Sequence, residues 1–151
     1  MVDLSASRVT IFPMIKSILL SILAWTLQVD AATLDACFIR AIHWVETSER
    51  LGPILGDSGA ALGPLQIHKA YWLDATTYDK TIKGNYSDCA RLDYSIKIMT
   101  AYLNKYSKQD IISSNYMVLA RKHNGGPMGH KNKNTLKYAE KVKVALNQIK
   151  K

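Results

Sequence analysis

A glycine-rich stretch at residues 56–67 restricts the folds open to this chain, because it interrupts a sequence whose other segments have helical patterning. Gly52-Pro53 ends the apolar helix pattern that precedes it. Three glycines and several small residues within the stretch predict a short hairpin or an irregular loop. We therefore expect an α+β protein, mainly helical, with one small β element among the helices.

Five helices are predicted from apolar residues at helical spacing, over residues 34–48, 69–75, 88–106, 116–122 and about 135–149. Thr33 can cap the first helix and Ser87 the third, because each offers a side-chain oxygen to free backbone N–H groups. The fourth helix runs into Asn124-Gly125-Gly126-Pro127, a glycine stop followed by proline. The part of the chain that contains these helices has the size of one domain and is large enough to form a single core.

The N-terminus predicts secretion. Lys16 precedes an apolar run at residues 18–27, and the small residues Ala31 and Ala32 follow. This order describes a signal peptide, residues 1–31, with cleavage after Ala31. The run is shorter than the roughly 20 apolar residues that span a bilayer, which makes a membrane anchor the weaker alternative. We expect an extracellular domain at residues 32–151, with Met14 as an alternative start.

Basic residues exceed acidic ones, with a formal net charge of +8. Seven lysines and one glutamate follow His130, so much of the excess lies near the C-terminus. Such a balance favours an anionic partner, which could be a nucleic acid, a membrane or a bacterial cell wall. Secretion argues against a nucleic acid. We expect an anionic cell-wall surface as the partner, and a monomer or weak dimer.

Two cysteines, Cys37 and Cys89, lie in the expected mature domain. In an oxidising compartment they could form one disulfide that joins the first helix to a later segment. The alternative is two buried thiols that act as small apolar side chains. No histidine or further cysteine stands beside either of them at metal-ligand spacing, so we expect neither a metal nor a cofactor.

Two carboxylates flank the break between the first helix and the glycine-rich stretch. Glu46 lies at the rim of the apolar helix face, where removal from water would favour its neutral form. Asp57 lies in the glycine-rich turn, where solvent and backbone N–H groups would keep it charged. One protonated and one ionised carboxyl group are what glycosidic-bond hydrolysis requires. Glu49 is the alternative acid, although Arg50 beside it favours an ion pair.

Two motifs, in this order and at this separation, resemble those of a known protein family. The first is a set of short runs, Trp44-Val45-Glu46, Gly56-Asp57-Ser58-Gly59, Gly63-Pro64-Leu65-Gln66-Ile67 and Tyr71-Trp72. The second is His123-Asn124-Gly125-Gly126-Pro127. Together they resemble the invertebrate-type (i-type) lysozymes, the family that includes destabilase. The similarity covers essentially all of Leu34 to Leu146.

The resemblance implies a lysozyme-like fold with a small β-hairpin beside the catalytic cleft. It also implies a secreted hydrolase of β-1,4 bonds between N-acetylmuramic acid and N-acetylglucosamine, in peptidoglycan or a chitin-like oligosaccharide, for antibacterial defence or digestion. Glu46 matches the family's proton donor and Asp57 its nucleophile, which implies retention at the anomeric carbon. The substrate-binding candidates are Gln66, His68, Lys69, Ala70, Tyr71, Trp72, Leu73, Asp74, Tyr102, His123, Asn124 and Gly125.

The chain departs from the family's pattern in two ways. Family members are usually rich in cysteines, whereas this chain has two. Thr47-Ser48 follow Glu46 where the family tends to have Ser-Gly. We therefore expect a less rigid loop between the two carboxylates. Some relatives also cleave isopeptide bonds at a serine-centred site, but no spacing between Ser58 and Lys69 identifies a dyad, so this activity is not predicted.

Two other functions are compatible with the sequence. A goose-type or phage-like lysozyme or transglycosylase shares a glutamate followed by Gly-x-x-Gln-Ile and explains the low cysteine count, but accounts poorly for residues 123–127. A non-catalytic cationic protein that binds cell walls could keep the same fold. The presence of both Glu46 and Asp57 argues against that second alternative.

Overall fold

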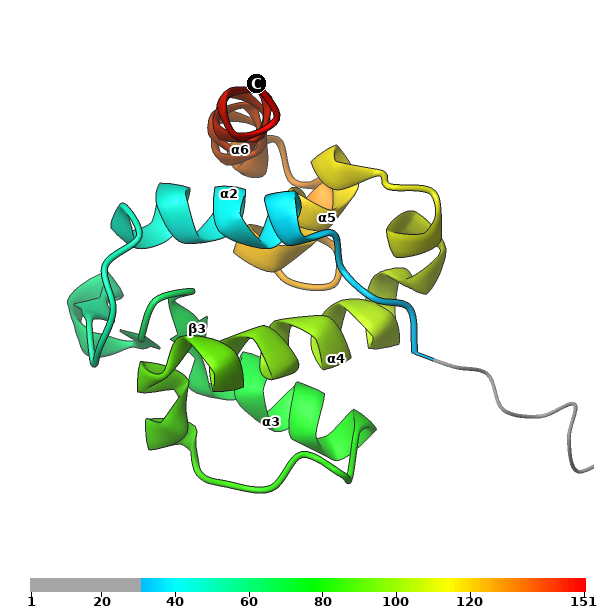
Figure 1. Cartoon of the computed structure of the whole chain (residues 1–151). Helices are drawn as coiled ribbons and strands as arrows, with labels where there is room; N and C mark the ends of the chain where they lie inside the picture. Colours follow the sequence, from blue (N-terminus) through cyan, green and yellow to red (C-terminus); the bar gives the residue numbers. More distant parts are fainter. Residues whose placement is uncertain (1–30) are drawn as a thin grey trace, which may run out of the picture. The chain divides into compact units, whose positions relative to one another are not determined.

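The computed structural model describes residues 31–151, so the predicted signal peptide falls on residues outside this range except for Ala31. Its elements in chain order are α2 (Ala36–Thr47), β1 (Leu55–Gly56), the 3-10 helix η1 (Asp57–Gly59), β2 (Ala61–Leu62), β3 (Ile67–His68), α3 (Lys69–Tyr78), η2 (Tyr86–Ala90), α4 (Leu92–Ile112), α5 (Tyr116–Gly125), η3 (Gly129–Lys131), η4 (Lys133–Thr135) and α6 (Leu136–Ile149). The predicted mainly helical α+β class is confirmed (Figure 1). Between residues 31 and 151 no helix is long and apolar enough to cross a membrane.

The β element is an antiparallel sheet of three short strands in the order β1-β2-β3, where the sequence predicted a hairpin or a loop. Leu55 pairs with Leu62, and Leu62 with Ile67. Gly63 is required between β2 and β3, because its φ is +82° and a Cβ there would lie 1.8 Å from the Cys89 carbonyl oxygen. The turn therefore packs directly on η2.

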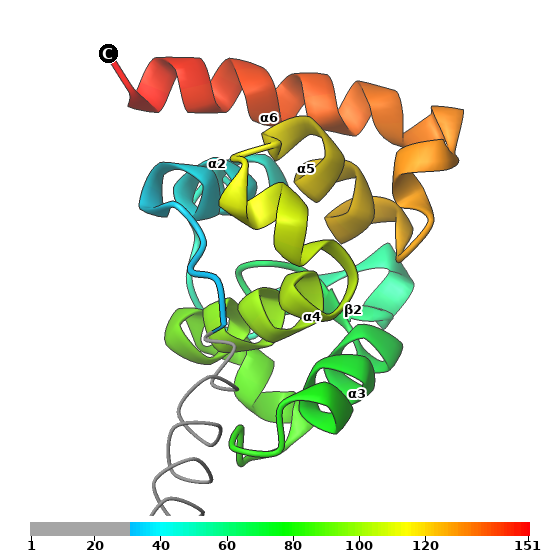
Figure 2. The same ribbon diagram turned by 90° about the vertical axis from the view of Figure 1, so that its right-hand side faces the viewer.

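The helices pack around one core. α6 packs on α2 and α5, and α4 packs on α3 and α5. Figure 2 shows α6 lying across α2 and α5, with α4 and α3 on the far side of them. Fully buried side chains from three helices meet between these layers, including Phe38, Ile42, Met99, Leu103 and Leu119. Burial of each such side chain stabilises the fold by about 1.5–3 kcal/mol relative to exposure, so these contacts hold α2, α4 and α5 together.

The first predicted helix is observed as α2, but it begins later than expected. Asp35 caps it by accepting a hydrogen bond from the Phe38 N–H at 3.0 Å, so the predicted cap at Thr33 is wrong. This hydrogen bond is the main reason that the pKa of Asp35 is lowered. At the other end Ser48 adopts a left-handed conformation with φ 54° and ends the helix directly after the turn that carries Glu46.

The other helices agree with the predictions in position, with one exception. Ser87 does not cap a long helix but lies within η2, whose capping box is formed by Asn85 and Asp88. Arg91 is extended and separates η2 from α4. The remaining predicted helices correspond to α3, α5 and α6, and α3, α4 and α5 all extend beyond their predicted ends.

The two cysteines are unpaired thiols, so the disulfide considered from the sequence is not formed. Cys89 is fully buried in η2, which packs on α4 and β2, whereas Cys37 is half-buried in the first turn of α2, which packs on α6. Burial raises the pKa of the Cys89 thiol to about 12. The cysteines therefore serve as small apolar side chains, the alternative that the sequence left open.

Candidate active site

Glu46 lies in the last turn of α2 and is shielded from most solvent, with 16% of its side chain exposed. The hydroxyl of Tyr138, from α6, donates a hydrogen bond to Oε1 of Glu46 at 2.6 Å. Nε2 of His123, from α5, lies 3.5 Å from the same oxygen. The packing of α6 on both α2 and α5 brings these three residues together. Glu46 thus combines partial burial with polar partners.

His123 is held by Tyr71, from the first turn of α3. The Tyr71 hydroxyl lies 3.2 Å from Nδ1 of His123. The ring of Tyr71 is stacked on Tyr102 of α4, with ring centroids 3.6 Å apart. Because Nε2 faces a carboxylate oxygen, we assign the proton to that nitrogen, and Nδ1 then accepts the hydrogen bond that Tyr71 donates. Side chains from α5 and α6 therefore contact Glu46, and side chains from α3 and α4 hold His123 in place behind them.

Three of the predicted saccharide-binding residues are more buried than the sequence led us to expect. Saccharide contacts were predicted for Tyr71, Tyr102 and His123, but these residues are only 9%, 2% and 8% exposed. They lie around Glu46 because aromatic rings from neighbouring helices stack in the core. Burial raises the pKa of the Tyr71, Tyr102 and Tyr138 hydroxyls well above the usual range, so all three stay neutral at working pH.

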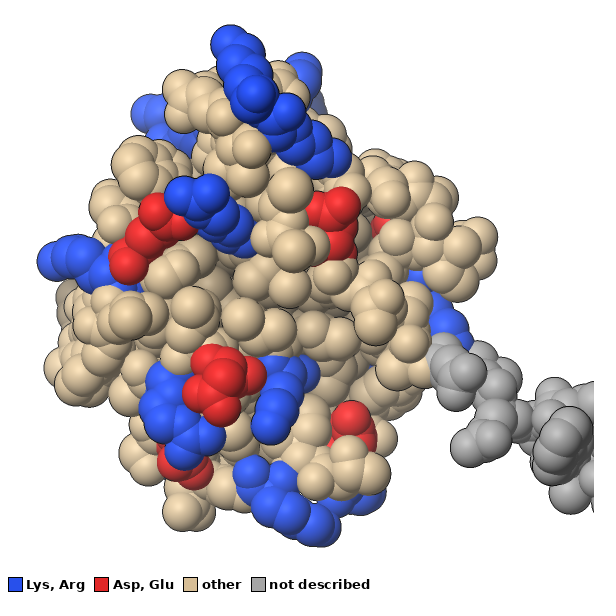
Figure 3. Space-filling model, viewed as in Figure 1, with Lys and Arg blue, Asp and Glu red and all other residues tan. Residues whose placement is uncertain are grey.

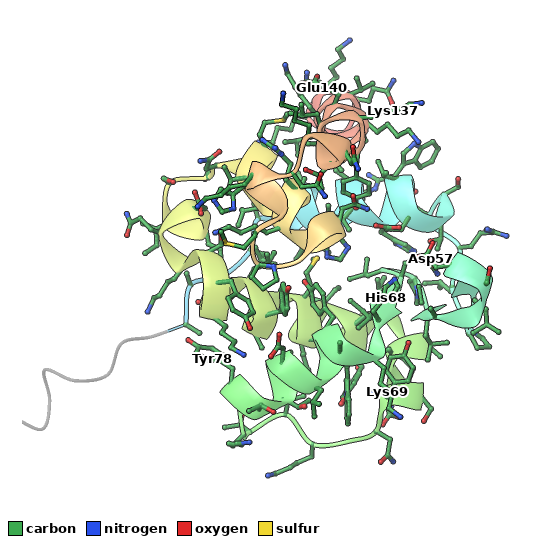
Figure 4. The ribbon with its side chains drawn as sticks, turned by 180° about the vertical axis from the view of Figure 1, so that it is seen from behind. Asp57, His68, Lys69, Tyr78, Lys137 and Glu140 are labelled. Carbon is green, nitrogen blue, oxygen red and sulfur yellow. The ribbon has the colours of Figure 1, made fainter. Side chains whose placement is uncertain are left out.

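Asp57 begins η1 and lies in a contrasting environment, with 71% of its side chain exposed. Its backbone is left-handed with φ 47°, and that of Ser58 is left-handed with φ 56°. Such backbone costs about 1–2 kcal/mol per non-glycine residue and persists where the surrounding structure fixes it. Nε2 of His68 lies 2.8 Å from Oδ2 of Asp57. In Figure 4 both side chains lie in the region between α2 and α3.

The start of α3 connects the two carboxylates. His68 is the residue at the N-terminal boundary of α3, and it contacts Asp57. Three positions later Tyr71 contacts His123, which faces Glu46. One helical turn spans this separation, so a single rigid segment sets the position of groups that touch both carboxylates. The sequence predicted the two candidates separately, and the structure links them.

Hydrogen bonds fasten the loop between the two carboxylates. The buried Thr47 hydroxyl donates to the Pro64 carbonyl at 3.0 Å. Nε2 of Gln66 donates to the carbonyls of Ile54 and Gly63 at 3.2 and 2.8 Å. Gln66 was predicted as a saccharide contact, yet its amide is engaged within the loop. The loop is thus tied at both ends without cysteines, which the sequence did not lead us to expect.

Two further substrate candidates hold α3 in place. Asp74 accepts hydrogen bonds from Nζ of Lys105 at 2.8 Å and from the Tyr106 hydroxyl at 2.9 Å, and Lys105 is the main reason that the pKa of Asp74 is lowered. Trp72 donates its indole N–H to the Tyr94 hydroxyl at 3.1 Å. Five candidates are exposed and remain free to meet a saccharide, namely Lys69, Ala70, Leu73, Asn124 and Gly125.

Tyr138 is a site residue that the sequence reasoning missed. It lies 92 positions after Glu46, in a helix predicted only as basic and C-terminal. Its one signal is a helical spacing shared with Val142 and Ala145, both buried. That spacing indicates a core-facing position and does not reveal a carboxylate partner.

A small helical domain in which a shielded glutamate and an exposed aspartate are joined through one helix start is a lysozyme-like domain. The solved structure of Tapes japonica lysozyme agrees with this class, with a TM-score of 0.59 and 28% identity over 72% of this chain and 88% of that chain. Residues 39–145 match the family described as Destabilase, and the chain belongs to that family. The resemblance seen in the sequence is therefore confirmed.

Bivalve lysozymes are similar to this chain in sequence. A lysozyme of Ostrea edulis is 31% identical over 128 residues, which cover 82% of this chain and 88% of that protein. Lysozyme 1 of Crassostrea virginica is 35% identical over 83 residues, or 54% of this chain, and the match spans 43% of that protein's length. These similarities favour the i-type interpretation over the goose-type alternative.

Proposed function

We infer that the protein is a lysozyme, a glycoside hydrolase that cleaves β-1,4 bonds between N-acetylmuramic acid and N-acetylglucosamine in peptidoglycan. Its membership of the destabilase family and its similarity to bivalve lysozymes support this function. The observation that carries it is the start of α3. There His68 contacts Asp57, and Tyr71 contacts His123, which in turn lies beside Glu46. Chitin-like oligosaccharides share the same N-acetylated sugars and are the second substrate class.

The two surroundings suit two different chemical roles. Glu46 protonates the glycosidic oxygen as the bond to the leaving sugar breaks, while Asp57 attacks the anomeric carbon and forms a covalent glycosyl-enzyme. Glu46, now a carboxylate, then takes a proton from a water molecule that attacks the same carbon and releases Asp57. Each displacement inverts the anomeric carbon, so the product keeps the configuration of the substrate.

Clearing of Gram-positive cell walls, with release of reducing ends, tests this function directly. Wild-type protein should clear the suspension, and Glu46→Gln should not. NMR analysis of the first product from a chito-oligosaccharide tests the role of Asp57, because retention requires the covalent intermediate. An inverted first product would remove Asp57 from the nucleophile role and restore the goose-type alternative.

The anionic wall surface is proposed to lie against α6 and the C-terminus. Figure 3 shows Lys and Arg side chains over α6, and seven lysines against one glutamate follow His130. A groove of about 740 Å³ between α2 and α6 contains the exposed Trp44 together with Lys137 and Lys141. Substitution of both lysines by glutamine should weaken association with walls and flatten its dependence on salt, because screening acts on long-range attraction.

The same lysine-rich stretch favours one other candidate function, a cationic antimicrobial protein that disrupts membranes without hydrolysis. Bacterial killing by Glu46→Gln separates the two. Equal killing by the variant and the wild type, with no reducing ends released by either protein, would support the cationic candidate and refute hydrolysis.

Secretion is part of the proposal. Cleavage after Ala31 would release a domain that begins at Ala32, for antibacterial defence or digestion. Mass spectrometry of the protein exported by a eukaryotic host should find Ala32 at the N-terminus. Recovery of the intact chain in the membrane fraction would favour the anchor alternative.

A further inference from the structure

We propose that Tyr71, His123 and Tyr138, here called the glutamate clamp, fix which oxygen of Glu46 carries the catalytic proton. The inference rests on the proposed role of Glu46 as general acid. It assigns His123 a positioning role, in place of the saccharide contact expected from the sequence. The reacting proton is assigned to Oε2, the oxygen that the clamp does not touch.

The two contacts between the clamp and Glu46 are made to the same atom, Oε1. The Tyr138 hydroxyl donates to Oε1 at 2.6 Å, and Nε2 of His123 lies 3.5 Å from Oε1. Among residues 31–151 no hydrogen bond is made to Oε2. An oxygen that accepts a hydrogen bond from Tyr138 and also faces the N–H of His123 is a poor place for a further proton, because the hydrogens would face one another. The neutral carboxyl group therefore carries its proton on Oε2.

The donors of the clamp are themselves fixed in place. Tyr71 is stacked on Tyr102 at a centroid distance of 3.6 Å, so its hydroxyl stays beside Nδ1 of His123. Only 3% of the His123 side chain is exposed, which leaves it no direct access to a sugar in solvent. Burial raises the pKa of Tyr71 and Tyr138 well above the usual range, so neither hydroxyl loses its proton at working pH.

The titratable groups that face Glu46 come from each helix packed around it. They are Tyr71 from α3, His123 from α5 and Tyr138 from α6, with Tyr102 from α4 behind Tyr71. Loss of a clamp donor should therefore disturb the orientation of Glu46 and lower the rate.

Tyr138→Phe tests the clamp, with kcat and KM measured for hydrolysis of a soluble chito-oligosaccharide. The expected result is a fall in kcat of about ten- to a hundred-fold, the scale of a small misplacement of a catalytic group. KM should stay within about two-fold, because the clamp acts on Glu46 and not on the saccharide. Tyr71→Phe, which removes only the hydroxyl beside His123, should lower kcat by less, and serves if Tyr138→Phe does not fold.

Tyr116→Phe is the matched control. Its hydroxyl lies beside a carboxylate at the opposite end of α2, that of Asp35, so the same atom is removed away from the site. Its kcat and KM should equal those of the wild type. A rise in KM for the clamp variants, with an unchanged kcat, would overturn the inference in favour of saccharide contact. Absence of hydrolysis by the wild type is a different result, which refutes the proposed function itself.

Discussion

Glu46 and Asp57 are assigned to one reaction, yet their surroundings differ in almost every respect. The Glu46 side chain is 16% exposed and contacts side chains from α5 and α6, whereas that of Asp57 is 71% exposed and contacts His68 alone among the charged groups. Shielding restrains a proton donor whose geometry must be held. Exposure leaves a nucleophile accessible to the sugar that it attacks. The fold therefore places its packing around Glu46, the proposed acid, and leaves Asp57, the proposed nucleophile, on a short turn.

The largest effect should come from removal of either carboxylate function. Glu46→Gln removes the proton donor and should lower kcat by about 10²–10⁴-fold, the usual contribution of general acid catalysis. Asp57→Asn should also abolish most hydrolysis, because an amide cannot form the glycosyl ester. The double variant should lose little more than the worse single variant, since the two groups act as a unit. Wall clearing and reducing-end assays measure all three, with circular dichroism as the folding control. Additive losses would contradict a shared mechanism.

The next effect concerns the loop that separates the two environments. Thr47→Val removes the hydroxyl that bonds the Pro64 carbonyl at 3.0 Å in a buried site, and should lower the free energy of unfolding by about 1–3 kcal/mol. Urea unfolding measures the change. Thr77→Val, at an exposed position of α3, is the control and should stay within about 0.5 kcal/mol. Equal effects at the two positions would mean that Thr47 does not fasten the loop.

A smaller effect is expected at His68, the partner of Asp57. His68→Ala removes the contact with Asp57 at 2.8 Å, but both side chains are largely exposed, at 48% and 71%. Exposed ion pairs contribute about 1 kcal/mol or less. The free energy of unfolding should therefore change by no more than that, and the change should shrink as salt is added. A loss above about 2 kcal/mol would show that the Asp57 turn depends on His68 for its structure.

The smallest effect is a gain in stability from one glycine substitution near Glu46 and one beside Asp57. Ser48 ends α2 and Ser58 follows Asp57, and both have left-handed backbone, with φ 54° and 56°. Left-handed backbone costs an L-residue about 1–2 kcal/mol, while glycine loses about 0.5–1 kcal/mol through unfolded-state entropy. Ser48→Gly and Ser58→Gly should each therefore stabilise the fold by roughly 0.5–1 kcal/mol. Thermal unfolding measures both, and a lower melting temperature for Ser48→Gly would contradict the backbone argument.

The sequence predicted features that depend on local spacing and failed where distant residues meet. Helical periodicity located α2, α3, α5 and α6, and glycines located the β element. The cap at Thr33 was wrong because Asp35 competes for the same role two positions later. The contact between Tyr138 and Glu46 was not predicted at all, because their 92-residue separation carries no pattern. Tyr71, Tyr102 and His123 were predicted as saccharide contacts, because their burial follows from tertiary packing that no spacing reveals.

The buried thiol of Cys89 has a consequence for how this domain responds to its chemical surroundings. Exchange between thiols and disulfides begins with a thiolate, and a pKa of about 12 leaves roughly one molecule in 10⁵ in that form at pH 7. The Cys89 thiol in the core should therefore react slowly with oxidants and with disulfides. The fold depends on hydrogen bonds and packing that are insensitive to redox potential, so the domain should keep its shape in a reducing cytoplasm as well as in an oxidising fluid.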